Sequence, residues 1–380
     1  MTDEIEVPYV DIAAQTAPLK EELLAAVART LDHSKFILGP EVEEFEERFA
    51  GLCGTRFAIG VASGTDALLL ALRAMDIDHG AEVITPPNSF VATASAIVVA
   101  GARPVFVDVC EDLNIDPDAI EAAITPRTRA ILPVHLTGRA AAMDRISELA
   151  ARHGLAVIED CAQAVLAERD GRRVGSFGQI GCFSLHPLKT LSAAGDAGVL
   201  TTDDASLADR LRLLRNIGLA TRDDATVWSI NSRLDTLQAA MMLAKLPYLD
   251  GWTEARRANA AAYRSALGGV AGLIVPVEAP NERPVYHTFV IQAEEREALR
   301  AHLERLRVGT AVHYPVPIHL QSVGRSLGYR EGDFPVAERQ AGRILSLPVH
   351  HALTSAQREH VIAGVLDFLE ASAEVRVVAS

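Results

Sequence analysis

Between residues 57 and 202, short β-branched apolar runs alternate with segments whose apolar residues recur at helical spacing. Parallel strands need crossover helices to return the chain to the same edge of the sheet, so this alternation predicts an α/β fold. Seven strands are enough for one large, mostly parallel sheet flanked by helices. We expect the strands at Phe57–Ala62, Glu82–Thr85, Pro104–Val109, Ala130–Val134, Ala156–Glu159, Gly181–Ser184 and Val199–Thr202, with helices at Asp66–Met75, Ala92–Ala100 and Ala140–Arg152.

A smaller α/β domain is expected at the C-terminal end, because 380 residues exceed the usual size of one domain. A long helical pattern from Leu234 to Leu267 is interrupted only by Pro247, and Gly268–Pro284 is rich in glycine and proline. We place the large domain at residues 1–250 and the small domain at residues 251–380. The small domain should contain strands at His287–Gln292 and Thr310–Tyr314 and helices at Arg296–Arg307 and Ser355–Glu370.

Charge and hydropathy exclude several classes of protein. Fifty acidic residues against 36 basic ones give a net charge of −14, which repels nucleic acid. No apolar run approaches the length that spans a bilayer, and Met1–Val10 lacks the basic and apolar regions of a signal peptide. The four cysteines are widely spaced and form no C-x-x-C pair, which favours a reducing cytoplasm. The twelve histidines show no metal-binding spacing, so no metal site is expected.

Ser63, Gly64 and Thr65 join an expected strand to a helix that continues through Ala67 and Leu68. Such a junction leaves backbone N–H groups free at the positive end of a helix, where a phosphate fits. An ordinary helix cap made by Ser63 or Thr65 explains the same residues.

Two further segments carry functional side chains. Asp160 follows an apolar strand, and ligands of open α/β sheets sit at the carboxyl ends of strands; an acid that only caps the next helix is the alternative. Gln163 lies three residues later and could orient a ligand or complete a helical turn.

Lys189 stands between apolar and small residues, where desolvation would lower its pKa and supply the neutral amine of Schiff-base chemistry. A plain surface lysine is the alternative.

A phosphate loop, a strand-end carboxylate and an apolar-flanked lysine are together what pyridoxal 5′-phosphate (PLP) needs from a protein. The lysine forms an imine with the cofactor, the carboxylate keeps the pyridine nitrogen protonated, and the helix end holds the phosphate. The sequence therefore indicates a PLP enzyme.

At this level the chain resembles the nucleotide-sugar aminotransferases of the DegT/DnrJ/StrS type, a branch of the PLP-transferase fold type I. The resemblance extends from about Val10 to Leu369. It rests on motifs in the family's order at Phe36–Pro40, Ser63–Leu68, Ile84–Pro86, Ser89–Thr93, Pro104–Val109, Pro133–Leu136, Glu159–Ala164, Gly181–Leu191, Asn231–Asp235, Gln238–Ala240, His313–Pro315 and Pro317–Gln321.

The resemblance implies a role for each motif residue around the cofactor ring. Lys189 falls at the lysine that binds PLP and moves the proton at the reacting carbon. Asp160 falls at the partner of the pyridine nitrogen, and Gln163 at the residue near the phenolic oxygen. Phe90 falls at the aromatic residue that stacks on the ring, although an apolar aromatic is equally explained as core.

The phosphate positions implied by the resemblance are Gly64, Thr65 and Ser184. Asn231 falls at a position that reaches the phosphate from the neighbouring subunit, which implies a homodimer with shared active sites. Asn231 could also be only a helix cap.

The substrate pocket is where the chain departs from the family. The family usually has Tyr or Phe at His186, often Tyr at Thr137, commonly His at Ile217 and a second Gly at Ala197. The first three would line the sugar pocket. Tyr314 and His319 are interpreted as residues at the pocket mouth, with a structural histidine as the alternative for His319.

The predicted function is PLP-dependent transfer of an amino group from an amino acid, L-glutamate being expected, to a keto group of a nucleotide-linked hexose or deoxyhexose. A keto-cyclitol aminotransferase stays open. Sugar dehydratases of the family carry histidine at the lysine position, so Lys189 argues against that branch. A non-enzymatic regulator would be expected to lack Lys189 or Asp160, and both are present.

Overall fold

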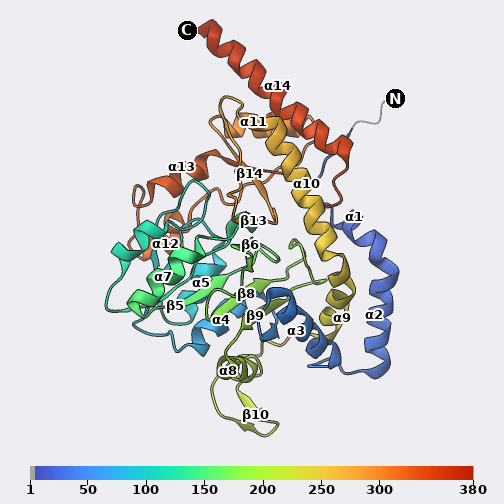
Figure 1. Ribbon diagram of the computed structural model, residues 1–380, viewed down its shortest axis with the longest axis vertical. Helices are drawn as coiled ribbons and strands as arrows, with labels where there is room; N and C mark the ends of the chain where they lie inside the picture. Colours follow the sequence, from blue (N-terminus) through green and yellow to red (C-terminus); the bar gives the residue numbers. More distant parts are fainter. Residues whose placement is uncertain (1–4, 380) are drawn as a thin grey trace.

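A seven-stranded sheet forms the centre of the computed structural model, which describes residues 5–379 and side chains up to residue 371 (Figure 1). Residues 1–4 and 380, the outer ends of the two expected domains, lie outside this part. The strand order is β1-β9-β8-β5-β4-β2-β3. The strands are β1 (Phe57–Val61), β2 (Glu82–Thr85), β3 (Arg103–Phe106), β4 (Thr128–Ile131), β5 (Ala156–Asp160), β8 (Ile180–Ser184) and β9 (Gly198–Thr202).

The sheet is parallel except for one strand. β9 pairs in antiparallel register with both β1 and β8, whereas β8, β5, β4, β2 and β3 pair in parallel. All seven predicted strands form and belong to this sheet, which confirms the predicted fold class. The carboxyl ends of β1, β5 and β8 therefore open on the same edge.

Helices cover both faces of the sheet, as alternate side chains along the strands show. Val83 packs into one hydrophobic cluster with α4 (Gly64–Ala74) and α8 (Ala205–Arg215). Its neighbour Ile84 packs into another, with α7 (Met143–His153). α5 (Ala92–Val99) lies against β2 and β3, while α6 (Pro117–Ile120) adds to the second cluster. α7 begins at Met143 rather than at Ala140 as predicted.

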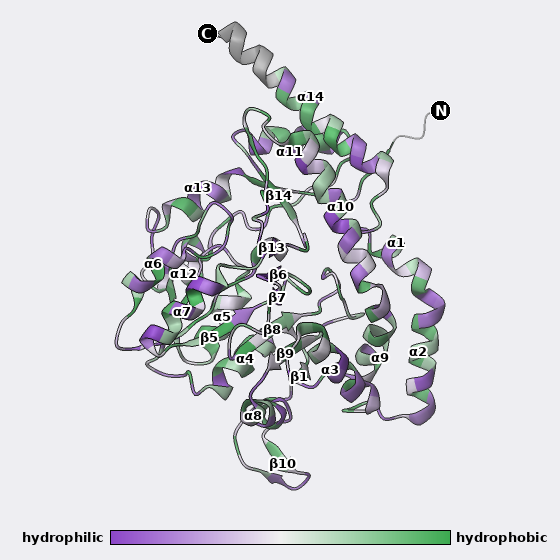
Figure 2. Ribbon diagram, in the orientation of Figure 1, coloured by the Kyte–Doolittle hydropathy of each residue, from purple (hydrophilic) through white to green (hydrophobic). Residues whose placement is uncertain are grey.

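The N-terminal segment adds helices that the sequence analysis did not predict: α1 (Ile12–Thr16), α2 (Lys20–His33) and α3 (Pro40–Cys53). α2 and α3 pack against α9 (Thr236–Lys245), and Figure 1 shows α2 beside α9. α9 is followed by a short 3-10 turn at Pro247 and by α10 (Leu249–Leu267), so the long helical pattern breaks where the proline predicted. Figure 2 shows hydrophilic and hydrophobic residues alternating along α2 and α10, as expected for helices with one buried face.

A second hydrophobic core joins C-terminal elements of the region predicted as the small domain. Its antiparallel sheet has the order β12-β14-β15 and packs with the second half of α10. The boundary at residue 250 stays a prediction, because α10 contributes Leu249 to the large core and Tyr263 to the small one. The elements are β12 (Leu273–Ile274), β14 (Phe289–Ala293), β15 (Ile344–Leu347), α11 (Arg296–Arg305), α12 (Ser322–Ser326), α13 (Pro335–Arg343) and α14 (Ser355–Ala379).

The predicted strand at Thr310–Tyr314 is wrong. Only Ala311 pairs there, in an isolated bridge with Ser346 of β15. Pro315 cannot donate a backbone hydrogen bond, and Tyr314 instead reaches a cavity described below. The strand that pairs with β14 is β15, which the sequence analysis missed.

Small hairpins complete the fold. β10 (Leu219–Thr221) and β11 (Asp224–Ala225) form a hairpin that projects from the body below α8 (Figure 1). β6 (Glu168–Arg169), β7 (Arg172–Arg173) and β13 (Glu282–Arg283) form a three-stranded ribbon. Among the described residues, none of the helices has the length and apolar character needed to cross a membrane.

Candidate active site

A cavity of about 650 Å³ lies at the carboxyl ends of the central strands and extends to residues of the small domain. Its walls come from the start of α4, the ends of β5 and β8, the loop before α5 and the segments around residues 287 and 313. The structure brings nine of the eleven predicted site residues to this cavity: Gly64, Thr65, Phe90, Asp160, Gln163, Ser184, His186, Lys189 and Tyr314.

One end of the cavity is the amino end of α4. Ser63 caps this helix by accepting a hydrogen bond from the Asp66 amide at 3.1 Å. The amides of Gly64 and Thr65 have no acceptor within the described chain, so they are free at the positive end of the helix. A Cβ on Gly64 would approach the Cβ of Ser184 to 2.6 Å, so the close approach of these two segments needs glycine. This end suits a phosphate.

Asp160 ends β5 and is buried beneath the cavity. Thr93 Oγ1 donates to its Oδ2 at 2.7 Å, and the Ala162 amide donates to Oδ1 at 3.1 Å. Burial raises the pKa of Asp160, while the bond from Thr93 and the charge of Lys189 oppose this shift. A buried carboxyl group with a raised pKa can share a proton with a heterocyclic nitrogen.

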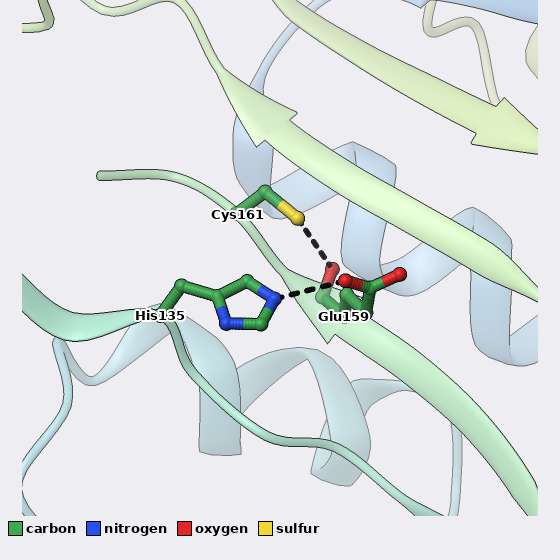
Figure 3. Close-up of side chains that lie close together, drawn as sticks. All are labelled: His135, Glu159 and Cys161. Carbon is green, nitrogen blue, oxygen red and sulfur yellow. Dashed lines mark hydrogen bonds and ion pairs between the residues drawn. The ribbon is translucent and has the colours of Figure 1, made fainter. Parts of the chain in front are cut away.

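The neighbouring Glu159 anchors this strand end from the other face of β5. Glu159 accepts hydrogen bonds from the amides of Gly175 and Gly178 and from Nε2 of His135, at 2.8 to 2.9 Å. Nδ1 of His135 accepts from the Ala141 amide, so Nε2 carries the proton. Figure 3 shows His135 pointing at Glu159, with the Cys161 sulfur near the Glu159 carbonyl.

The His135, Glu159 and Cys161 side chains lie close enough together to hold a metal ion. Both ring nitrogens of His135 and both carboxylate oxygens of Glu159 are already engaged in hydrogen bonds. The group is therefore better explained as a buried hydrogen-bonded network that fixes the end of β5.

Lys189 enters the cavity from the loop after β8. Burial lowers the pKa of its amine to about 8, and the charge of Asp160 opposes the shift. At pH 7 about a tenth of the amine is therefore neutral, a far larger fraction than in an exposed lysine. This is the property required of a nucleophile that forms an imine.

Phe90, Gln163 and Tyr314 also line the cavity. Phe90 is 57% exposed, so it belongs to the cavity surface rather than to the core. Its ring lies 5.7 Å from that of Tyr314. Gln163 accepts from the Thr137 amide at 2.7 Å and donates to the Tyr314 hydroxyl at 3.3 Å, which fixes both side chains.

Two predicted site residues lie elsewhere. His319 is fully buried outside the cavity, where its Nε2 bonds Glu338 at 2.9 Å and its ring packs on Phe334. The interpretation of His319 as a pocket-mouth residue is therefore wrong, and the structural alternative fits. Asn231 is exposed, beyond the cavity of its own chain.

The positions where the chain departs from the family are also separated. His186 is exposed at the cavity rim. Thr137 lines a neighbouring cavity, which shares Thr288 with the first. Ile217 is exposed at the base of the β10–β11 hairpin and does not line either cavity.

Several cavity residues were missed by the sequence analysis: Tyr9, Thr93, Arg256, His287, Thr288 and His313. Thr93 lies in the motif Ser89–Thr93, but nothing in the sequence indicates its hydrogen bond to Asp160. Arg256 lies within a long helix among other arginines, and no local pattern distinguishes it.

Comparison with known proteins agrees with this geometry. Residues 18–366 match the sequence profile described as the DegT/DnrJ/EryC1/StrS aminotransferase family. The chain belongs to this family. Within the DegT/DnrJ/EryC1/StrS family, it is 45% identical over 365 residues to the dTDP-3-amino-3,4,6-trideoxy-alpha-D-glucose transaminase of Streptomyces venezuelae, and the match covers 96% of both chains.

Solved structures share the fold of this chain. S. venezuelae DesV, in complex with a ketimine intermediate, matches with a TM-score of 0.94 and 45% identity over 96% of this chain and 99% of DesV. NtdA from Bacillus subtilis, with bound cofactor PMP, matches with a TM-score of 0.91 and 31% identity over 97% and 86% of the two chains.

The cofactor of this aminotransferase is PLP, and the cavity fits it. The free amides at the start of α4 suit its phosphate, the buried carboxyl group of Asp160 suits its ring nitrogen, and the amine of Lys189 suits its aldehyde. These three groups come from different segments of the chain and all line one cavity.

Proposed function

We propose that the protein transfers an amino group from an amino acid, with L-glutamate as the expected donor, to a keto group of a nucleotide-linked deoxyhexose. The observation that carries this proposal is the convergence of Lys189 and Asp160 on one cavity, with the free amides of α4 at its end. The Streptomyces relative, named as a transaminase of a dTDP-linked trideoxyglucose, supports the choice of acceptor.

In this proposal the sheet side of the cavity holds the cofactor. The amides of Gly64 and Thr65 and the hydroxyl of Ser184 bind the phosphate, and Phe90 covers one face of the ring. Asp160 holds a proton on the ring nitrogen, and Gln163 lies near the phenolic oxygen. When bound, PLP supplies an electron sink for the electron pair released at the reacting carbon.

Lys189 moves the proton in both halves of the reaction. In the first half-reaction its Nζ would take the proton from Cα of the amino donor and pass it to C4′ of the bound cofactor. In the second half-reaction Nζ would take a proton from C4′ and pass it to the sugar carbon that receives the amino group. A pKa of about 8 suits both tasks at neutral pH, because general acid–base catalysis works best when the pKa lies near the working pH.

The sugar would bind between Phe90, His186 and Tyr314, which line the cavity and of which Phe90 and His186 are exposed. Exposure of His186 leaves a way out for the nucleotide. The same pocket could accept a keto-cyclitol, which is the alternative substrate. A sugar dehydratase is disfavoured by the lysine at position 189.

We also propose a homodimer with shared active sites. Asn231 is exposed and lies outside the cavity of its own chain, which supports a role in the partner's site. Apolar side chains near it are exposed, including Trp228 at 99% and Ile217 at 42%. Light scattering would measure the mass of the assembly, and the cofactor affinity of Asn231→Ala would test whether the active sites are shared.

A cytoplasmic location is part of the proposal, supported by four cysteines that form no disulfide.

The experiment that tests the function separates the two halves. The PLP-loaded protein is treated with ¹⁵N-labelled L-glutamate, freed of small molecules, and mixed with a dTDP-linked 3-keto-6-deoxyhexose or with a keto-cyclitol. The proposal predicts 2-oxoglutarate in the first step and a ¹⁵N-labelled amino sugar in the second, detected by mass spectrometry. Labelled aminocyclitol in place of amino sugar would support the alternative, and no labelled product from either acceptor would contradict the proposal.

A further inference from the structure

The cavity wall formed by the small domain contains a buried cation without a counter-ion. Arg256 of α10 is 3% exposed and lines the cavity. Only its Nη1 has acceptors, the carbonyl oxygens of Tyr286 and His287, each at 3.3 Å. Its Nε has no partner, and no carboxylate of the described residues forms an ion pair with it. Burial lowers the pKa of Arg256 to about 10, so the guanidinium stays charged at neutral pH.

Further unpartnered polar atoms belong to residues that line the same cavity. They are Nδ1 of His287, Oγ1 of Thr288 and both ring nitrogens of His350, all buried. His287 is held neutral, because burial and the charges of Lys189 and Arg256 lower its pKa well below the usual range. An unpaired buried charge with unpaired neighbours is costly unless a ligand satisfies it.

We propose that Arg256, with His287 and Thr288, forms a subsite that binds a carboxylate of the amino-acid donor. This inference rests on the proposed aminotransferase function and assigns residues to its donor. The fork of the guanidinium matches a carboxylate, and the imidazole and hydroxyl add neutral hydrogen-bond donors.

The position of the subsite fits a donor whose Cα lies at Lys189. The charges of both Lys189 and Arg256 act on His287, so the subsite and the lysine share one region of the cavity. The cofactor phosphate is accounted for by the start of α4, at Gly64 and Thr65. Arg256 is 3% exposed, so only a small terminal group of a ligand can contact it.

The test uses glutarate, which has the carboxylates of glutamate and no amine, and so binds without reacting. Calorimetry on the PLP-loaded protein compares glutarate with the uncharged glutaramide. The wild type should bind glutarate the more tightly, and Arg256→Met should weaken glutarate binding by about 10- to 100-fold, as expected for a hydrogen-bonded charge pair. Arg257→Met is the matched control: it lies next on α10, bonds Pro284 and Glu278, and does not line the cavity.

A kinetic readout separates donor binding from a structural role of Arg256. In Arg256→Met, the glutamate concentration that half-saturates the first half-reaction should rise by the same factor, with a smaller change in its plateau rate. Half-saturation by the keto sugar in the second half-reaction should stay within about twofold. An effect on L-alanine as well as on L-glutamate would assign the α-carboxylate to Arg256, and an effect on L-glutamate alone the side-chain carboxylate.

Three results would overturn the subsite: equal binding of glutarate and glutaramide to the wild type, unchanged glutarate binding in Arg256→Met, or equal weakening of donor and sugar. If Arg256→Met does not fold, two measurements decide. They are the binding of glutarate against glutaramide by the wild type, and the binding of glutarate by Arg256→Lys, which keeps the charge. Glutarate binding that depends on Arg256 in a protein that converts no glutamate would refute the proposed function and keep the carboxylate subsite.

Discussion

The two walls of the cavity differ in how the chain builds them. The wall on the sheet side is made of strand ends and the start of α4, where Asp160, Ser184 and Gly64 are brought together by the topology of β1, β5 and β8. The opposite wall is made of α10 and of C-terminal loops, whose residues are far in sequence from the sheet. On the proposed function the two walls would divide the work: the sheet wall would hold the cofactor, and the opposite wall would bind the carboxylate of the amino donor.

The largest expected effect is on the sheet wall. Lys189→Ala removes the amine that forms the imine and moves the proton, so the glutamate half-reaction should slow by at least about a thousandfold. Stopped-flow absorbance of the cofactor measures the rate, with Lys35→Ala, an exposed lysine elsewhere, as control. Retention of the wild-type rate in Lys189→Ala would remove the basis of the comparison.

Asp160→Asn should slow both half-reactions by about a hundredfold, because the amide cannot hold the proton on the ring nitrogen in the way a carboxylate does. The concentrations of glutamate and sugar needed for half-saturation should change little, since Asp160 belongs to the cofactor wall. A loss confined to glutamate affinity would show that the two walls do not divide the work.

The pH dependence of cofactor attachment tests the pKa of Lys189. Burial lowers this pKa to about 8, so in cofactor-free protein the rate of PLP attachment should rise about tenfold per pH unit below 8 and level off above it. The charge of Asp160 raises the pKa, so Asp160→Asn should move the midpoint to lower pH. A midpoint near the ordinary value of 10.5, found by stopped-flow mixing with PLP, would contradict the burial of this amine.

The smallest effect concerns Thr93, which lines the sheet wall next to Asp160. Thr93→Val removes the 2.7 Å hydrogen bond to Asp160, which raises the pKa of that carboxyl group further. A loss of about 1 kcal/mol corresponds to a rate about fivefold lower in both half-reactions. Thr93→Ser keeps the hydroxyl and should restore the rate, whereas equal losses in both variants would indicate a packing effect.

Much of the sheet and of its wall could be predicted from the sequence. Strand-end residues such as Asp160 and Ser184 follow buried apolar runs, and parallel strands bring such ends to one edge whatever the side chains are. Gly64 and Lys189 were likewise found because their neighbours along the chain are distinctive. The break of the long helix at Pro247 followed from the chemistry of proline.

The opposite wall could not be predicted, because its residues have no local signal. Arg256 is one arginine among several on α10, and its lack of a counter-ion appears only after the domains pack. His319 lies in the motif Pro317–Gln321, but its side chain bonds Glu338, nineteen residues later. This partner lies outside the motif, so the motif could not indicate it. The segment at Thr310–Tyr314 has strand-forming residues, yet pairing with Ser346 stops at Ala311.

The central claim is that Lys189 binds the cofactor within the sheet wall. Reduction of the PLP-loaded protein with borohydride, followed by proteolysis and mass spectrometry, tests it most directly. The account predicts a phosphopyridoxyl group on the peptide that contains Lys189, and none on Lys20, Lys35 or Lys245. Label on another lysine, or no label on a protein that has been mixed with PLP, would contradict it.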